Sequence, residues 1–345
     1  MSTCPSPRKR LNASVRLASV AAALLLAFGA ASGAEAEPLK IKLQYAAGTQ
    51  LVPIIPLAPP SLYRHYGKSY VVEPVFMAGA GPALTAYAAN EVHIATLNPQ
   101  SIANAVATAK LDITAFVQVF STDVPGNAQS EFWALDTIKK IEDLRGRPVG
   151  INTRGSTPEA GARIVFARHG LKDGDWQPVE MPFSAGLAAL EAKRVDASIL
   201  VLPFNFLAAK KPGLHRLFTV GDAFGPSESV LWTAKPEFLA KNRAVMVDFI
   251  EDHIRFRHWV LDPATRMEAI KLVAQVDKQP VENYADWLFT NKDQYRHPNG
   301  LINIERFQKN VNDLAAAGTA AATIDAKKHI DVSIVQDAAS RLGTH

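Results

Sequence analysis

The sequence predicts an α/β protein with two lobes of similar build, each a mainly parallel sheet flanked by helices, and a helical C-terminal tail. The first observation is a repeated unit: residues 73–99 and 177–203 both read as a strand, a small-residue turn, an Ala-rich helix and a second strand ending at proline. Such units build parallel sheets, whose ligands bind beyond the carboxyl ends of the strands. Two lobes therefore predict a cleft between them, and one large sheet is the alternative. The copies share the pattern Pro-Val-x-Met, which is Pro74-Val75-x-Met77 in the first and Pro178-Val179-x-Met181 in the second.

The second observation is that strand-like and helix-like stretches alternate along the chain. Residues 39–46 alternate polar and apolar side chains and predict the first strand. Four prolines between Val52 and Pro60 delay the next helix until after Pro60. Strands are then expected at 71–77, 93–98 and 113–120 and helices at 82–90 and 100–109, until Pro125-Gly126-Asn127 ends this block.

The pattern then repeats in a second block. Residues 129–136 predict a strand that crosses to the second lobe, and residues 213–226 read as a loop-rich return crossover. We therefore expect residues 37–128 and 226–345 to form lobe 1 and residues 129–225 to form lobe 2. Within lobe 2 the strands are expected at 148–152, 176–181 and 197–202, with helices at 158–169 and 185–194; the tail helices are expected at 237–260, 265–276, 281–290, 304–316 and 333–342.

The N-terminal segment has the three parts of a secretory signal peptide. Basic Arg8-Lys9-Arg10 precedes the apolar stretch Leu17–Phe28, and Ala34-Glu35-Ala36 forms an A-x-A cleavage site. Residues 1–36 are thus predicted to be removed, which places the protein in the periplasm; an uncleaved signal anchor is the alternative. The only cysteine, Cys4, lies in this segment, so the mature chain is expected to contain neither a disulfide nor thiol chemistry.

The charge balance gives no sign of a nucleic-acid partner. The whole chain carries a formal net charge of +4, and much of this excess lies in the signal peptide. The mature chain is close to neutral and has no dense basic run, so the electrostatic footprint of a nucleic-acid-binding protein is missing.

Several motifs resemble one group of periplasmic binding proteins, the nitrate/sulfonate/taurine/thiamine-precursor type of ABC-transporter substrate-binding protein. They are GAGPA at residues 79–83, NAQSEFWAL at 127–135, the run Ile141–Ile151 and Arg154-Gly155-Ser156-Thr157. The resemblance covers Leu39 to Leu261. It implies a type II periplasmic-binding fold and a monomeric receptor that closes on a small solute and delivers it to an ABC permease with its ATPase.

The turn Thr153-Arg154-Gly155-Ser156-Thr157-Pro158 is the first candidate ligand site. It joins a strand to a helix, and the free N–H groups and positive dipole end of a helix start favour an anion. Ser156 or Thr157 has the alternative role of capping that helix. The resemblance favours the ligand role, because similar family members use this turn for an acidic group. Gly79-Ala80-Gly81-Pro82 is the matching turn of lobe 1; Gly79 and Gly81 allow close backbone approach, although the third glycine of a dinucleotide motif is absent.

Other candidates lie at predicted strand ends, where polar or aromatic side chains orient a ligand. Each has a plain alternative, a turn cap for the polar residues and core packing for the aromatic ones. In lobe 1 these candidates are Gln44, Ala47, Asn98 and Gln118, and in lobe 2 or the return crossover they are Phe183, Asn205 and Trp232.

The sequence predicts a binding protein and not an enzyme. It contains no G-x-S-x-G, H-E-x-x-H, C-x-x-C or P-loop pattern, and its histidines are scattered, so neither a metal nor another cofactor is expected. Enzymes that share the family fold rely on cysteine chemistry that the mature chain lacks. A secreted sensor component is the main alternative. The solute is expected to be a small organic anion such as a sulfonate or carboxylate, or a pyrimidine.

Overall fold

The computed structural model describes residues 1–3 and 37–343, and Pro38–His345 form one compact unit. The proposed signal peptide and its cleavage site lie outside the described residues. The described part contains two five-stranded sheets, so the prediction of two similar α/β layers is confirmed and a single large sheet is excluded. No helix among the described residues is both long and apolar enough to cross a membrane.

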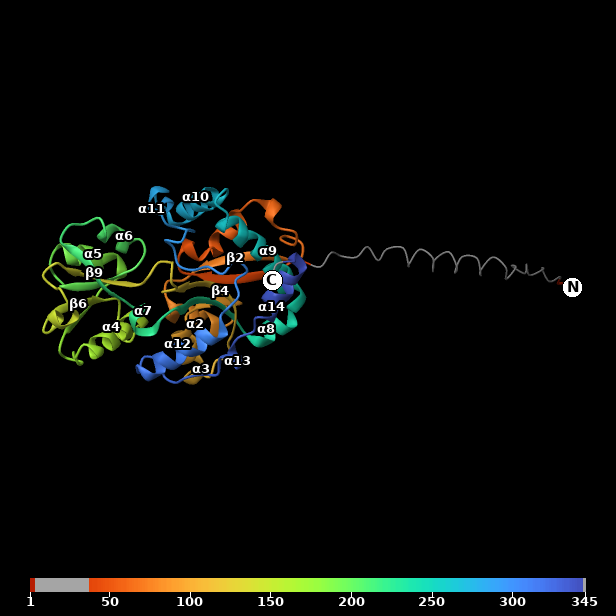
Figure 1. Ribbon diagram of the computed structural model, residues 1–345. Helices are drawn as coiled ribbons and strands as arrows, with labels where there is room; N and C mark the ends of the chain where they lie inside the picture. Colours follow the sequence, from red (N-terminus) through yellow and green to blue (C-terminus); the bar gives the residue numbers. More distant parts are fainter. Residues whose placement is uncertain (4–36, 344–345) are drawn as a thin grey trace. The chain divides into compact units, whose positions relative to one another are not determined.

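Sheet A has the strand order β2-β1-β3-β10-β4. Strands β2 and β3 run parallel to β1, whereas β10 runs antiparallel to both of its neighbours. Helices α2, α3 and α12 lie on one side of this sheet and α9 and α10 on the other (Figure 1). The strands are β1 (Leu39–Tyr45), β2 (Tyr70–Phe76), β3 (Ile94–Leu97), β4 (Thr114–Thr122) and β10 (Ser227–Ala234), and the helices between them are α2 (Ala80–Ala88) and α3 (Pro99–Ala107).

Sheet B has the same arrangement, with the order β7-β6-β8-β5-β9 and an antiparallel strand, β5, in the corresponding place. Helices α5 and α6 lie on one side and α4 and α7 on the other (Figure 1). The strands are β5 (Glu131–Leu135), β6 (Pro148–Ile151), β7 (Gln177–Glu180), β8 (Ala197–Leu200) and β9 (Leu214–Thr219), and the helices are α4 (Thr157–Arg168), α5 (Phe183–Glu191), α6 (Phe204–Ala208) and α7 (Gly221–Phe224).

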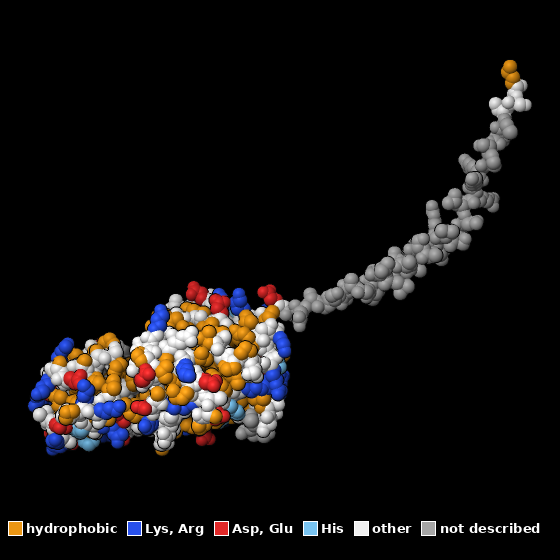
Figure 2. All heavy atoms as spheres, turned by 90° about the horizontal axis from the view of Figure 1, so that it is seen from above, with side chains coloured by type: hydrophobic (Ala, Val, Ile, Leu, Met, Phe, Trp, Pro, Cys, Tyr) orange, Lys and Arg blue, Asp and Glu red, His pale blue; other side chains and the backbone are white. Residues whose placement is uncertain are grey.

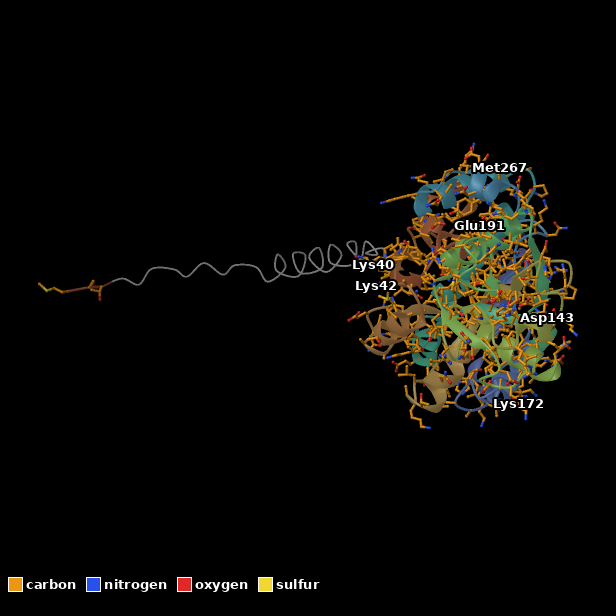
Figure 3. All side chains as sticks on the ribbon, turned by 90° about the vertical axis from the view of Figure 1, so that its left-hand side faces the viewer. Lys40, Lys42, Asp143, Lys172, Glu191 and Met267 are labelled. Carbon is orange, nitrogen blue, oxygen red and sulfur yellow. The ribbon has the colours of Figure 1, made fainter. Side chains whose placement is uncertain are left out.

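After β10 the chain is helical and returns to sheet A. Its longest helix, α9, carries buried side chains along most of its length because it packs between the sheet and the other tail helices. Side chains exposed on the outer surface include those of Lys172, near sheet B, and Glu191, at the end of α5 (Figure 3). The tail helices are α8 (Pro236–Lys241), α9 (Arg243–Leu261), α10 (Arg266–Asp277), α11 (Glu282–Ala285), α12 (Ile304–Ala316), α13 (Ala326–His329) and α14 (Ser333–Leu342).

Several local expectations are corrected. The proline-rich stretch forms 3-10 turns before and after Pro60, not a loop followed by a helix, because prolines begin such turns readily. The stretch expected to be a loop-rich crossover contains β9 and α7. The long tail helix is divided at Asn242, and the helix expected at 281–290 stops at Ala285. The short 3-10 elements are η1 (Gly48–Gln50), η2 (Val52–Leu57), η3 (Pro60–Leu62) and η4 (Ile141–Leu144).

Asp252 on α9 ties the segment before β2 to the helical tail. Its buried carboxylate accepts hydrogen bonds from the backbone N–H groups of Arg64, His65 and Tyr66 at 2.8, 2.9 and 3.2 Å. It also accepts one from the hydroxyl of Tyr70 at 3.1 Å, and Arg255 supplies the positive charge at 2.7 Å. The burial of Tyr70 and the neighbouring Asp252 raise the pKa of the Tyr70 hydroxyl far above its ordinary value. Asp252 is therefore a fully paired buried ion that fixes a loop without regular structure of its own.

Candidate binding cavity

A cavity of about 370 Å³ lies among the carboxyl ends of strands from both sheets. Both chain crossings between the sheets, from β4 to β5 and from β9 to β10, contribute to its wall. The wall combines hydroxyl and amide groups with three phenyl rings, a composition typical of sites for small organic ligands. The residues that line the cavity include Asn98, Gln100, Phe120, Asp123, Gln129, Asn152, Ser156, Thr157, Phe183, Phe224, Glu228, Gln294 and Asn310.

Four of the residues singled out in the sequence line this cavity. Asn98 ends β3 and caps α3, accepting a hydrogen bond from Ser101 N–H at 2.7 Å. Ser156 caps α4, and its hydroxyl donates to Asn152 Oδ1 at 2.6 Å. Thr157 and Phe183 lie at the first positions of α4 and α5. Ser156 therefore caps its helix and lines the cavity at once, so the two roles considered for it are compatible.

Four other candidates are buried away from the cavity wall. Gln44 donates to Met77 C=O at 3.0 Å and accepts from Thr96 N–H at 2.9 Å. Gln118 likewise uses its amide within the protein, since it donates to the hydroxyl of Ser121. Asn205 and Trp232 are also buried; Asn205 accepts from the next backbone N–H, and the Trp232 ring stacks on Phe249 with centroids 5.5 Å apart.

The remaining candidates lie at turns outside the cavity wall. Ala47 precedes η1, and Gly79 and Gly81 are exposed at the start of α2. Thr153 lies three residues before Ser156 in the same loop. It is exposed and donates to Glu180 Oε2 at 3.1 Å. The structure thus brings together the α3, α4 and α5 starts but not the α2 start.

Gln100 joins the two sheet-bearing halves across the cavity. Its side-chain amide donates to Gly155 C=O before α4 and to Thr319 C=O at 3.0 Å, after α12. Its Oε1 accepts from the Thr157 hydroxyl at 3.1 Å. Gln100 was not among the predicted site residues, although it lies two residues after Asn98, which was. Gln294 and Asn310 were missed because no strand or motif precedes them in the helical tail.

Two buried carboxylates, Asp123 and Glu228, provide the formal charges of the wall. Glu228 is 2% exposed, accepts from Ser121 Oγ at 2.9 Å and pairs with Arg306 at 3.3 Å. Burial raises the pKa of Glu228 despite these partners. Asp123 is 4% exposed and accepts from Ser130 N–H at 2.9 Å. Its burial raises its pKa to about 6, although hydrogen bonds from Ser130, Thr122 and Gly221 act in the opposite direction.

The raised pKa of Asp123 predicts a pH-dependent stability. Between its unfolded value near 3.8 and its folded value of about 6, the native state binds more protons than the unfolded state. The free energy of unfolding should therefore fall by about 2 kcal/mol as the pH rises from 4 to 6, and the remaining contribution, about 0.4 kcal/mol, should be lost by about pH 7. Urea titrations at several pH values measure the free energy of unfolding. Asp123→Asn should flatten its dependence on pH, whereas Glu191→Gln, at an exposed site, should leave that dependence unchanged. An unchanged slope in Asp123→Asn contradicts the assignment.

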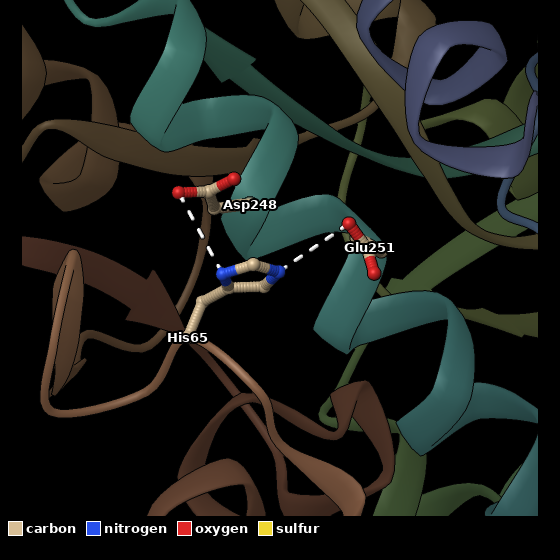
Figure 4. A group of neighbouring side chains, drawn as sticks. All are labelled: His65, Asp248 and Glu251. Atoms are coloured by element: carbon tan, nitrogen blue, oxygen red, sulfur yellow. Dashed lines mark ion pairs between the residues drawn. The ribbon is translucent and has the colours of Figure 1, made fainter. Parts of the chain in front are cut away.

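Elsewhere, His65, Asp248 and Glu251 form the one group of described side chains with the composition of a metal site (Figure 4). The imidazole lies between the carboxylates, with Nδ1 3.8 Å from Asp248 and Nε2 3.3 Å from Glu251. A single ion cannot use both ring nitrogens. Glu251 also contacts Arg255 and Arg341. Burial alone acts to raise the pKa of Glu251, but these cations outweigh it and lower that pKa. The arrangement is that of an ion-pair network.

Comparison with known proteins gives one family. Residues 34–274 match the model described as the NMT1-like family. A curated relative from Brucella abortus (strain 2308), described as a binding protein, is 27% identical over 158 residues, or 44% of this chain. The match spans 48% of that relative, so the chain covers about half the length of the curated relatives it matches.

Solved structures show the same fold at low sequence identity. The periplasmic aliphatic sulphonate binding protein SsuA from Escherichia coli is 19% identical, with 86% of this chain and 92% of that chain covered and a TM-score of 0.64. The periplasmic nitrate-binding protein NrtA from Synechocystis PCC 6803 is 14% identical, with 89% of each chain covered and a TM-score of 0.65. The desulfurization enzyme DSZB is 11% identical, with 88% and 99% covered and a TM-score of 0.60. The predicted fold class is thereby confirmed.

Proposed function

The chain belongs to the NMT1-like family, and on that premise we propose that it is the periplasmic solute-binding component of an ABC importer. It would bind one small organic solute as a monomer and deliver it to a permease that works with an ATPase. The observation that carries this proposal is the cavity of about 370 Å³ at the strand carboxyl ends, with walls from both sheets. This is where open α/β sheets bind their ligands. A secreted sensor component with the same cavity is the second candidate.

Binding would close two lobes, formed by residues 37–128 with 226–345 and by residues 129–225. The proposed hinges are Asn127–Ser130 and Gly221–Glu228, the segments in which the chain passes between the sheets. Both segments contribute to the cavity wall, so a solute held there contacts the hinges directly. Gln100 supports closure further, because its amide pairs with atoms from both halves. A permease that contacts both lobes then distinguishes the loaded from the empty protein.

Catalysis is not part of the proposal. A desulfurization enzyme shares the fold, but fold alone does not carry chemistry from one protein to another. Among the described residues, the cavity wall contains no cysteine, histidine or lysine. We therefore assign the hydroxyl and amide groups of the wall to recognition.

The test is a thermal-shift screen of protein that has been unfolded and refolded to remove any trapped solute. Sulfonates, nitrate, carboxylates, pyrimidines and amines would be compared. A solute at a hundredfold excess over its Kd adds about 2.7 kcal/mol, which shifts the unfolding midpoint by several degrees. The bound solute is expected to lose about tenfold or more in affinity in the double variant Ser156→Ala/Thr157→Ala. Thr153→Ala, in the same turn but outside the wall, serves as the control.

One outcome contradicts the proposed function, and another removes the start of α4 from the site. If no class of solute shifts the midpoint of the folded protein, the chain is not a solute receptor of this kind. If a solute binds and the double variant keeps its affinity within twofold, the solute does not use the start of α4.

A further inference from the structure

Asp123 stands out as the carboxylate of the cavity wall that has no cationic partner. Glu228 forms an ion pair with Arg306, but among the described residues no lysine, arginine or histidine forms an ion pair with Asp123. Backbone N–H groups hold Asp123 instead, with Ser130 at 2.9 Å. A buried carboxylate without a counter-charge is costly.

The charged groups around Asp123 do not supply that counter-charge. Asp222 on α7 and Glu228 on β10 are of the same sign. Asp293, whose C=O accepts from Ala128 N–H, is paired with Arg296 at 3.1 Å. The cations that reach α7, Arg168 and Lys309, bind its backbone carbonyls and not a carboxylate at the cavity. None of these described cations therefore forms an ion pair with the Asp123 carboxylate.

The start of α4, where the sequence predicts an anion, already has a carboxylate. Glu159 in its first turn is 5% exposed and accepts from Gly155 N–H at 3.2 Å. A buried carboxylate at that position meets the positive end of the helix dipole. The attraction that this helix start offers to a solute anion is correspondingly reduced, and no lysine or arginine of the described part of the chain lines the cavity.

The aromatic side chains of the wall favour a ligand with a planar apolar group. Phe120, Phe183 and Phe224 come from β4, α5 and α7 and all contribute to the same cavity. Phenyl rings favour stacked or edge-on contacts with flat groups and attract cations over their faces. Arg296 makes such a contact within the protein, because its guanidinium lies 5.2 Å from the centroid of the Phe120 ring. Phe120 also lines the cavity.

We propose that the cavity binds a small organic cation, an amine or amidine on a flat apolar body, whose N–H groups bind the Asp123 carboxylate. The proposal rests on the function proposed above and replaces the expected anion with a positively charged solute. Asp123 would then be a specificity-determining residue, because among the described residues it supplies the one charge of the wall that has no ion-pair partner. Its position between the two chain crossings also links recognition to closure.

Proton release gives the proposal a distinctive readout. The pKa of Asp123 without solute is about 6, and a bound cation stabilises the charged carboxylate and lowers that pKa. Binding of a cation at pH 6 therefore releases a fraction of a proton, and affinity rises between pH 5 and pH 7. An anion has the opposite effect, because it raises the pKa and takes up a proton.

The experiment is isothermal titration calorimetry on refolded protein with solutes of one shape and different charge. Benzylamine and benzamidine are the cations, benzyl alcohol is the neutral member, and benzoate and benzenesulfonate are the anions. Titrations at pH 6 in two buffers of different ionisation enthalpy measure the protons released. We expect the cations to bind at least tenfold more tightly than benzyl alcohol, with proton release, and the anions not to bind.

Asp123→Asn should weaken cation binding by at least tenfold and abolish the proton release. Glu191→Gln, which removes a carboxylate from the exposed surface, should change neither quantity (Figure 3). If Asp123→Asn does not fold, the charge series and the proton release of the unmodified protein decide the question by themselves.

The outcomes that overturn the inference are separate from those that overturn the proposed function. Binding of the anions in preference to the cations overturns the inference and leaves a solute receptor. Cation binding that is unchanged in a folded Asp123→Asn variant overturns the role of Asp123. If neither this series nor the wider solute screen gives any binding, the proposed function and the inference both fail.

Discussion

Replacing Asp252 by alanine is expected to lower the free energy of unfolding by about 3–5 kcal/mol, the usual cost of removing one partner from a buried ion network. The change leaves three backbone N–H groups in residues 64–66 without their acceptor and takes a partner from Arg255. Each of these partly buried donors that is left unpaired adds a desolvation cost. Urea-induced unfolding followed by circular dichroism measures the loss.

The matched control is Asp248→Ala, one turn earlier on the same helix. Its carboxylate is partly exposed and pairs with Arg341 at 2.8 Å, so we expect a loss of only about 1 kcal/mol or less. Equal losses in the two variants would show that Asp252 does not hold the loop before β2. Figure 2 shows charged side chains of both signs spread over the face in view, which is the setting in which single surface pairs contribute little.

Replacing Gly150 by valine is expected to destabilise the protein by about 3 kcal/mol or more. Gly150 in β6 pairs with Ser198 in β8, and a Cβ at Gly150 would lie 2.4 Å from Ser198 Oγ and 3.0 Å from its Cβ. Ser198 is fully buried and also lies against Gly186 in α5, so it has no room to move away. Thermal unfolding of the purified variant measures the effect.

A second substitution tests the cause of this loss. Ser198→Gly removes the side chain that a larger residue at position 150 meets, so the double variant should recover about half of the lost stability. Gly81→Val, at an exposed helix position with open space around it, should change stability by less than about 0.5 kcal/mol. If Ser198→Gly gives no recovery, the contact between β6 and β8 is not the cause.

The sequence was most informative where local chemistry decides structure. The repeated strand-turn-helix unit predicted two similar sheets, because its apolar strands and small-residue turns have few other uses. Asn98 and Ser156 were recognisable as helix starts that follow a strand, and that position brings both to the cavity. Strand β9 was missed because it is only partly buried, so its apolar pattern is weak.

Residues whose role depends on distant packing were beyond such reasoning. Trp232 was expected near the cleft, but its strand, β10, runs through the middle of sheet A and directs the indole onto α9. Gln44 and Gln118 have polar side chains of the kind that bind ligands, but these side chains form hydrogen bonds with neighbouring backbone and hydroxyl groups. Asn310 reaches the cavity from the helical tail, and no sequence pattern near Asn310 predicts that contact.

The place of β10 has a consequence for the order of folding. Sheet B is built from one continuous stretch, from β5 to β9, so it can assemble as soon as that stretch is available. Sheet A lacks the strand between β3 and β4 until the chain has passed through all of sheet B and returned. Closing that long loop costs entropy before the new contacts compensate for it, which delays non-local strand pairing. A chain that emerges N-terminus first would therefore complete its second sheet before its first, and until then the edges of β3 and β4 stay open to pairing with other chains.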